Sequence, residues 1–186
     1  MIKTHAIVMQ ELENYKAPGN KLSRMVNDEL IIPVIRSLYE TEKNTPGYLL
    51  AGSIYGPSYL SFDYALSHYG LIPEAVYVFT SATFEKRKAK KFTTQFGTFI
   101  YRDVPSSIYP LGIQIKKEGP YAYAIASPEK ALCDKLYSIS PVKNKKEMQQ
   151  LLFSDLRIDE NEFIKLNHDD LITLCELYHC TNLKIL

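Results

Sequence analysis

Residues 20–40 read NKLSRMVNDELIIPVIRSLYE, in which an amphipathic stretch is followed directly by one rich in β-branched residues. Leu22, Met25 and Val26 recur at helical spacing, so the first half predicts a short helix with an apolar back and a polar, basic front. The second half is interrupted by Pro33, which a sheet tolerates on an edge strand or in the turn of a hairpin. A small hairpin directly after a helix predicts the wing of a winged helix.

Another helix is predicted upstream, over residues 4–14, and Ala17, Pro18 and Gly19 then break it. With Asn20 as the N-cap of the following helix, the two form a helix-turn-helix. A helical pair with a hairpin that merely packs on the rest of the chain fits the same residues equally well.

The polar front of the second helix carries side chains of the kind that contact DNA. A recognition helix presents its first turns to the major groove, and a wing meets phosphate or the minor groove. The residues in those places are Lys21, Ser23, Arg24 and, on the hairpin, Arg36. The alternative is a solvated helix face, because residues 1–45 hold six basic and six acidic side chains and so lack a broad positive field.

The rest of the chain alternates between helices and strands. Ser61 caps a helix that runs to Tyr69, and Ser127 with Pro128 begins another. Beyond Pro141 the pattern is helical to the end. Strands are predicted between the first two of these helices, at residues 75–80, 91–104, 108–116 and 120–126.

These patterns predict an α+β protein with an N-terminal winged helix-turn-helix at residues 1–45 and a connector holding a short helix at 46–60. Residues 61–186 then form a mixed α/β domain with a small sheet and a helical tail. Ala122, Ala124 and Ala126 give the last strand a small face, against which we expect the next helix to lie closely.

Charge is distributed unevenly along the chain, although the net charge is only +1. Residues 1–85 carry 6 basic and 9 acidic side chains. Residues 86–146 carry 13 basic and 4 acidic side chains, and residues 147–186 carry 3 basic and 8 acidic ones. The middle is therefore strongly basic, which suits contact with a polyanion or an acidic partner, and equally suits a solvated basic loop. Its densest part, named here the basic segment, consists of Lys86, Arg87, Lys88, Lys90 and Lys91.

The best enzyme candidate is a nucleotidyltransferase, whose Gly-Ser pair is followed by two metal-binding carboxylates spaced as Asp-x-Asp. Gly52 and Ser53 are followed by Asp63, but the second carboxylate would fall at Ala65, so two magnesium ions could not be held. No phosphate-binding Gly-rich loop, zinc-binding His-Glu-x-x-His or Gly-x-Ser-x-Gly elbow is present. The sequence therefore predicts no catalytic residues and no cofactor.

The three cysteines, Cys133, Cys175 and Cys180, are an odd number and predict free thiols in a reducing compartment. Cys175, His179 and Cys180 lie close together in sequence, but a structural zinc site normally has four ligands, so we expect no metal. No stretch is long and apolar enough for a membrane helix or a secretory leader. We expect a cytoplasmic protein with no membrane partner.

The run from Pro57 to Tyr137 resembles the AbiEi family of antitoxins, the regulatory half of type IV toxin-antitoxin pairs. The resemblance is carried by PSYLSFDYALSHYGLIPE, by VYVFTSAT with the basic segment and FTTQFGTFIY, and by YAIASPEKALCDKLY, in matching order and spacing. KLSRMVNDELIIPVIRSLYE also looks like the winged helix of that family. Two glycines and a basic residue that are usual in the family's wing are replaced, at Asp28-Glu29, Ser37 and Pro33.

The resemblance implies an N-terminal domain that represses its own operon and a C-terminal domain that counters a nucleotidyltransferase toxin encoded alongside, often in abortive infection against phage. We therefore expect a DNA-binding autoregulator and antitoxin, with double-stranded operator DNA as its partner and direct contact with the toxin left open. The alternative is a protein-interaction module, or an orphan regulator, whose winged domain no longer binds DNA.

Overall fold

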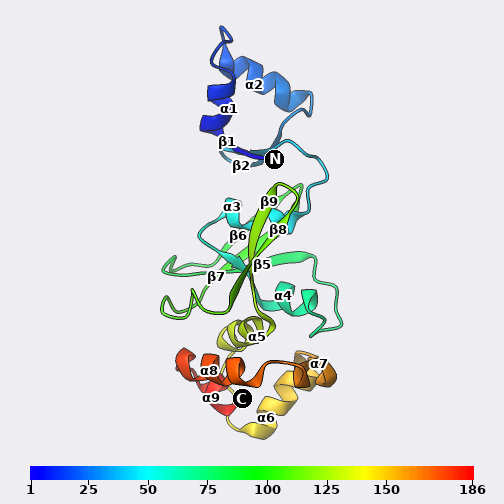
Figure 1. Cartoon of the computed structure of the whole chain (residues 1–186), viewed down its shortest axis with the longest axis vertical. Helices are drawn as coiled ribbons and strands as arrows, with labels where there is room; N and C mark the ends of the chain where they lie inside the picture. The colour runs from blue at the N-terminus through cyan, green and yellow to red at the C-terminus, as the bar shows by residue number, and fades with distance from the viewer.

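Figure 1 shows the computed structural model, which describes residues 1–186, as an elongated molecule in three parts. Two helices and a three-stranded sheet form the N-terminal end, a six-stranded sheet forms the middle, and a layer of helices forms the C-terminal end. The fold is mixed α+β, and the predicted fold class is confirmed.

The N-terminal unit has the helix, helix and hairpin order that the sequence predicts. Strands β2 and β3 form the hairpin, and β1 pairs with β3, giving the antiparallel order β1-β3-β2. A small apolar core under the two helices consists of Val8, Leu12, Leu22 and Ile31. The elements are β1 (Ile2–Thr4), α1 (His5–Glu11), α2 (Pro18–Asn27), β2 (Ile32–Ile35) and β3 (Leu38–Glu40).

Two predictions about this unit are wrong in detail. The sequence does not predict strand β1, and α1 covers only His5–Glu11 of the expected residues 4–14. Thr4 is its N-cap, with its hydroxyl oxygen accepting from the Ile7 N–H at 3.3 Å, and the helix ends three residues earlier than predicted. Asn20 is not an N-cap, since α2 begins two residues earlier, at Pro18. Proline has a fixed φ and no N–H to satisfy, so it suits a first helical position and starts the helix here.

The six-stranded sheet has the order β6-β7-β5-β4-β9-β8 and mixes parallel with antiparallel pairs. The two-residue strand β4 lies in its interior, antiparallel to β5 and parallel to β9. The expected connector at residues 46–60 holds η1 (Gly47–Leu49) and α3 (Ala51–Ile54) and supplies β4. The strands are β4 (Tyr59–Leu60), β5 (Val78–Thr83), β6 (Lys90–Thr94), β7 (Gly97–Asp103), β8 (Ile113–Glu118) and β9 (Tyr121–Ala126).

Helix α5 (Pro128–Tyr137) lies between the six-stranded sheet and the C-terminal helices (Figure 1). Ser127 caps it as predicted, its hydroxyl oxygen accepting from the Lys130 N–H at 3.2 Å. The other helices are α4 (Phe62–His68), α6 (Lys145–Gln149), the π-helical turn η2 (Gln150–Asp155), α7 (Glu160–Ile164), α8 (His168–Tyr178) and α9 (Thr181–Ile185). None of them combines the length and the apolar character of a membrane-crossing segment.

The alanine face of β9 is not covered by α5 along its whole length, contrary to the prediction. Ala126 is buried, but Ala124 is half-buried and Ala122 is exposed, so α5 does not cover this face along its length. η1 and α3 approach the strand as well. An open groove remains over the exposed end, with Gly52 and Ser53 on its far wall.

Candidate nucleic-acid interface

Helix α2 turns its apolar side inward and its polar side outward, as its sequence predicts. Leu22 is buried, and Met25 and Val26 are half-buried against the N-terminal core. Ser23 and Arg24 are exposed on the other side of the helix. The helix thus offers a polar surface while its burial holds the backbone in place.

The three polar residues of α2 are not equally available to a ligand. Lys21 is half-buried, and its Nζ lies 5.5 Å from the centre of the Tyr15 ring. The Ser23 hydroxyl donates to the Gly19 carbonyl oxygen at 3.0 Å, so only its lone pairs are available to a new partner. Arg24 is exposed, and its guanidinium has no partner within the chain, which makes it the most available cation of the helix.

The hairpin that follows α2 presents Arg36 at its turn. Arg36 is exposed, and Ser37 completes the two-residue turn between β2 and β3. The Ser37 carbonyl oxygen accepts from the His5 N–H at 2.9 Å, which fixes the turn to the start of α1. Pro33 is exposed on β2, an edge strand, where its missing N–H costs little, as predicted.

Two residues of this unit adopt the left-handed backbone conformation that favours glycine. Glu29, after α2, has a φ of 54°, and Ser37, in the hairpin turn, has a φ of 66°. Both lie where the resemblance leads us to expect glycine. The backbone therefore keeps the conformation that glycine would favour, while this chain places side chains there, and the Glu29 carboxylate pairs with Lys43 at 2.5 Å.

The basic segment is partly a turn and partly the start of a strand. Lys90 and Lys91 are the first residues of β6, an edge strand. Lys86 is half-buried; its Nζ donates to the Gly56 carbonyl oxygen at 3.2 Å and lies 5.2 Å from the centre of the Tyr55 ring. Lys86 is therefore held against the loop before β4 and is less available than its neighbours.

The turn itself is fixed by Asp103 at the end of β7. Its carboxylate accepts from the Arg87 N–H and from the Thr83 hydroxyl, each at 2.6 Å. Arg87 has a φ of 65°, which this hydrogen bond helps to hold. The cations left exposed on this surface are Arg87, Lys88, Lys90 and Lys91.

The positive charge of residues 86–146 does not form a single strip. The basic segment lies at the β6 edge of the sheet, whereas Lys116 and Lys117 lie on β8, the opposite edge. Lys130 is buried, and Lys135 pairs with Asp63 at 2.6 Å. Our sequence interpretation of one basic middle therefore needs correction, because strand order separates residues that are close in sequence.

Sequence reasoning also did not single out the exposed or half-buried cations on the other strands of the sheet: Arg102, Lys116 and Lys117. Arg102 follows Tyr101, which pairs with Lys90, so it lies beside the start of β6. Lys116 is held by Tyr69, whose ring centre is 5.1 Å from its Nζ. Alternation along the strands could have identified Arg102 and Lys117 as exposed, but only the strand pairing shows which edge each one joins.

None of the predicted DNA-contacting cations is neutralised by an acidic neighbour. The ion pairs of the chain involve other residues, such as Lys3 with Glu11 at 2.7 Å and Lys165 with Glu162 at 2.6 Å. Lys21, Arg24, Arg36 and the basic segment form none. Lys86 and Lys21 have the partners within the chain described above. The exposed members of the set are left to solvent or to an external anion.

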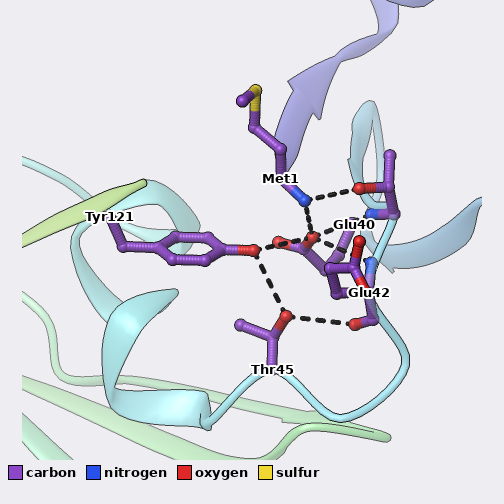
Figure 2. A network of polar contacts seen from close by, with 6 residues as sticks. Met1, Glu40, Glu42, Thr45 and Tyr121 are labelled. Atoms are coloured by element: carbon purple, nitrogen blue, oxygen red, sulfur yellow. Dashed lines mark hydrogen bonds and ion pairs between the residues drawn. The ribbon is translucent and has the colours of Figure 1, made fainter. Parts of the chain in front are cut away.

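A polar joint connects the hairpin to the six-stranded sheet (Figure 2). Glu40, the last residue of β3, is fully buried, and its Oε1 accepts from the Tyr121 hydroxyl at 2.9 Å and from the Glu42 N–H at 3.0 Å. The Met1 nitrogen also contacts this carboxylate. Tyr121 begins β9 and points toward Glu40 and Thr45, so the hairpin is held to the sheet that carries the basic segment.

The hydrogen bonds of the joint favour the ionised form of the Glu40 carboxyl. Burial by itself would raise the pKa of the Glu40 carboxyl, but hydrogen bonds from the Met1 nitrogen, the Glu42 N–H and the Tyr121 hydroxyl outweigh it. The pKa of Glu40 is therefore lower than its usual value. The carboxylate is charged at neutral pH and can accept all of these hydrogen bonds.

No protein-family model and no curated protein matches this chain.

A second polar cluster, buried in the C-terminal part, was not foreseen from the sequence. Lys130 and Asp134 are both fully buried on α5, with Nζ and Oδ1 3.2 Å apart. Asp134 Oδ2 also accepts from the Ser61 hydroxyl at 2.6 Å and from the Tyr59 hydroxyl at 3.0 Å, and Lys130 donates to the Tyr178 hydroxyl at 2.5 Å. The cluster joins β4, α5 and α8.

This buried cluster contains side chains of the types found in catalytic sites, but it is not accessible from solvent. Burial raises the pKa of Tyr59 and of Tyr178, and it lowers the pKa of Lys130 against the opposing effect of Asp134. Because Lys130 and Asp134 have no exposed surface, a substrate could not reach them. The cluster is suited to holding three elements together.

Proposed function

We propose that this protein binds double-stranded DNA through α2 and the hairpin turn, and that it represses its own operon. The observation that carries this proposal is that Arg24 and Arg36 are both exposed and both lack an acidic partner. They lie on the helix and on the hairpin turn that follow one another in a winged-helix order. Arginine is well suited to phosphate and to base edges because its planar guanidinium donates in pairs.

The amount of charge indicates how such a complex would form. Residues 1–45 carry as many acidic as basic side chains, so long-range attraction to DNA is weak and binding depends on a few local contacts. Lys21 and Ser23 can add to them, Ser23 only as an acceptor while its proton is engaged with Gly19. We expect a modest dependence of affinity on salt, of about one unit of slope per cation in contact with phosphate.

We further propose that the protein is the antitoxin of a type IV pair and counters a nucleotidyltransferase toxin encoded beside it. This rests on the resemblance to the AbiEi family over residues 57–137. The exposed cations at the β6 edge are the part of that region best placed for antitoxic action, because they have no role in holding the fold.

The rival is a winged domain that docks a protein and has lost DNA binding, and the balanced charge of residues 1–45 favours it. Fluorescence anisotropy with the upstream region of the gene as duplex DNA separates the two. The proposal expects binding with a modest salt dependence that Arg24→Ala weakens about tenfold or more, as loss of a charge-assisted contact does.

The matched control for that experiment is Lys165→Ala. Lys165 is an exposed cation directly after α7, and α7 lies at the far end of the molecule from α2 (Figure 1). Its removal changes the net charge by the same amount, so DNA affinity should stay within about twofold. Equal effects of the two variants, or no binding to DNA at all, would exclude α2 as the contact surface.

A further inference from the structure

Strand β6 leaves one edge of the six-stranded sheet without a partner. It pairs only with β7, in an unbroken register from Lys90 opposite Tyr101 to Thr94 opposite Gly97. In an antiparallel pair, every second residue turns its N–H and C=O groups away from the neighbouring strand. On β6 these outward groups form no backbone hydrogen bond within the chain. They are therefore free to pair with another extended segment.

The edge is held in place from behind. Phe92, at the centre of β6, is half-buried, and its ring centre lies 5.9 Å from those of Tyr55 and Tyr101. The turn before β6 is fixed by the Asp103 carboxylate, which accepts from the Arg87 N–H at 2.6 Å. An added strand would therefore meet a preformed edge, and this chain would lose little conformational entropy on binding it.

Both faces of β6 carry a cation beside this edge. Successive side chains of a strand point to opposite faces, so Lys90 lies on the face of Phe92 and Lys91 lies on the other face. Both lysines are exposed, and neither forms an ion pair. The exposed side chains of Arg87 and Lys88 continue the positive charge beyond the start of the strand.

We propose that the β6 edge binds an extended acidic segment of another protein by strand addition, with the carboxylates of that segment beside Lys90 and Lys91. Because the cations lie on both faces, the segment that fits best carries acidic residues at adjacent positions, one for each face. The inference extends the antitoxic role proposed above for this edge, and it rests on that role only for the protein that supplies the segment.

The same lysines disfavour a second copy of this chain at the edge. Two β6 strands side by side would bring Lys90 and Lys91 of one copy next to those of the other, and like charges on neighbouring strands destabilise a sheet. An acidic strand places opposite charges there instead. Charge therefore selects between two occupants that supply the same backbone hydrogen bonds.

Nucleic acid fits only part of this edge. Phosphates can pair with the lysines, but the outward carbonyl oxygens of β6 need N–H donors, which a phosphate backbone does not offer. An extended peptide offers both N–H and C=O groups at strand spacing. Glu85 is the single acidic residue between Phe84 and Thr94, so an acidic segment would meet little repulsion.

The other exposed sheet edges are less suited to an acidic strand. The β2 edge contains Pro33, and its register with β3 shifts between Pro33 and Ile35. The β8 edge carries Glu118 as well as cations, and the Lys116 Nζ lies 3.3 Å from the His68 Nε2. Strand β6 has no proline, no irregular register and no acidic residue.

The test uses the full chain and a labelled, capped peptide of valine, threonine and glutamate in which glutamates occupy adjacent positions. Fluorescence anisotropy should show saturable binding that weakens as salt is added. Hydrogen exchange should slow over Lys90–Thr94 when the peptide is bound, because free edge amides become paired. Exchange over Ile113–Glu118, the opposite edge, should stay unchanged.

A second peptide separates strand addition from attraction between charges. It has the same sequence but carries methyl groups on adjacent central backbone nitrogens, so that one of them faces β6 in any register. Binding should weaken about tenfold or more, since the hydrogen bonds are lost while the charge is kept. This comparison uses the wild-type chain and does not depend on the folding of any variant. Equal affinity for the two peptides would overturn strand addition.

Two double variants place the binding site. Lys90→Glu with Lys91→Glu should weaken binding of the unmethylated peptide about tenfold or more, because both attractions become repulsions. Lys145→Glu with Lys146→Glu is the matched control, since these adjacent lysines are exposed at the start of α6 and form no ion pair. Its affinity should stay within about twofold of the wild type. Equal losses for the two variants would reject the β6 edge as the site.

Three further results would overturn the inference. They are an absence of peptide binding, exchange over β6 that slows with protein concentration alone, which indicates a second copy, and exchange that slows with duplex DNA of unrelated sequence, which indicates nucleic acid. Failure of the antitoxic role is distinguishable from these results. If the peptide binds as described but Lys90→Ala with Lys91→Ala still counters the proposed toxin, the edge binds acidic strands and the antitoxic role of these lysines is rejected.

Discussion

The Lys130 ammonium lies 3.2 Å from the Asp134 carboxylate one turn along α5, and neither side chain has any exposed surface. The tyrosines that complete their surroundings come from β4 and α8. One helix thus uses a single ion pair to hold the sheet on one side and the C-terminal helices on the other.

Removing one member of this pair should strongly destabilise the protein. Asp134→Ala leaves the Lys130 charge buried without its counter-ion and removes the acceptor for the Tyr59 and Ser61 hydroxyls. We expect a loss of about 3–5 kcal/mol in the free energy of unfolding, measured by urea denaturation. A control on the same helix is Lys135→Ala, whose partly exposed pair with Asp63 should contribute about 1 kcal/mol or less. Similar losses for the two variants would contradict this assignment.

Acid should weaken the joint between the hairpin and the sheet. The pKa of Glu40 is lowered in the folded protein, so its contribution to stability is present above the pKa of the unfolded chain and is lost as the pH falls through the lower, folded pKa. Glu40→Gln removes this titration. The free energy of unfolding of the wild type should therefore drop more between pH 6 and the acid range, down to about pH 3, than that of the variant.

The Tyr121→Phe variant provides an independent check on the same joint. It removes the 2.9 Å hydrogen bond from the Tyr121 hydroxyl and with it one of the influences that lower the pKa of Glu40. The acid-dependent loss of stability should shrink but not vanish. Parallel stability curves for wild type and both variants would show that Glu40 does not titrate as described.

The parts of the fold that the sequence predicts are those set by local chemistry. Leu22, Met25 and Val26 mark the buried side of α2, Pro33 marks an edge strand, and Ser127 marks the start of α5. Each of these depends on residues within one turn or one strand. Local patterns therefore suffice for the helix and hairpin that carry the candidate interface.

What the sequence does not predict depends on contacts across the chain. Strand β4 has only two residues, too few for alternation to be visible, and it is recognisable only by its pairing with β5 and β9. Lys130 lies in a helix, where a lysine normally indicates solvent, and its partner Tyr178 is 48 residues away. The split of the basic residues between the two sheet edges likewise follows from strand order, which periodicity does not reveal.

A glycine at position 37 should stabilise the hairpin. Ser37 has a φ of 66°, a conformation that costs a residue with a side chain about 1 kcal/mol relative to glycine. Ser37→Gly should therefore raise the free energy of unfolding by about that amount and leave DNA affinity unchanged, since the backbone already has the required shape. Ser37→Ala is the matched control, because alanine keeps the strain and should bring no gain. A stabilisation by alanine equal to that by glycine would mean that the serine side chain, not φ, is the cause.

The cations at the β6 edge should serve antitoxic action more than operator binding. Lys90 and Lys91 belong to the six-stranded sheet, whereas α2 and the Arg36 turn belong to the separate N-terminal sheet and its helices (Figure 1). We expect Lys90→Ala with Lys91→Ala to keep operator affinity within about twofold and its salt slope unchanged. If the proposed antitoxin role is right, the same variant should fail to restore growth when the nucleotidyltransferase proposed to be encoded beside it is expressed. Lys116→Ala with Lys117→Ala removes equal charge from the opposite edge, on β8, and should still restore growth.

If instead the Lys90 and Lys91 variant lowers the salt slope by about two, both lysines contact phosphate, and the DNA surface extends from the winged unit onto the sheet.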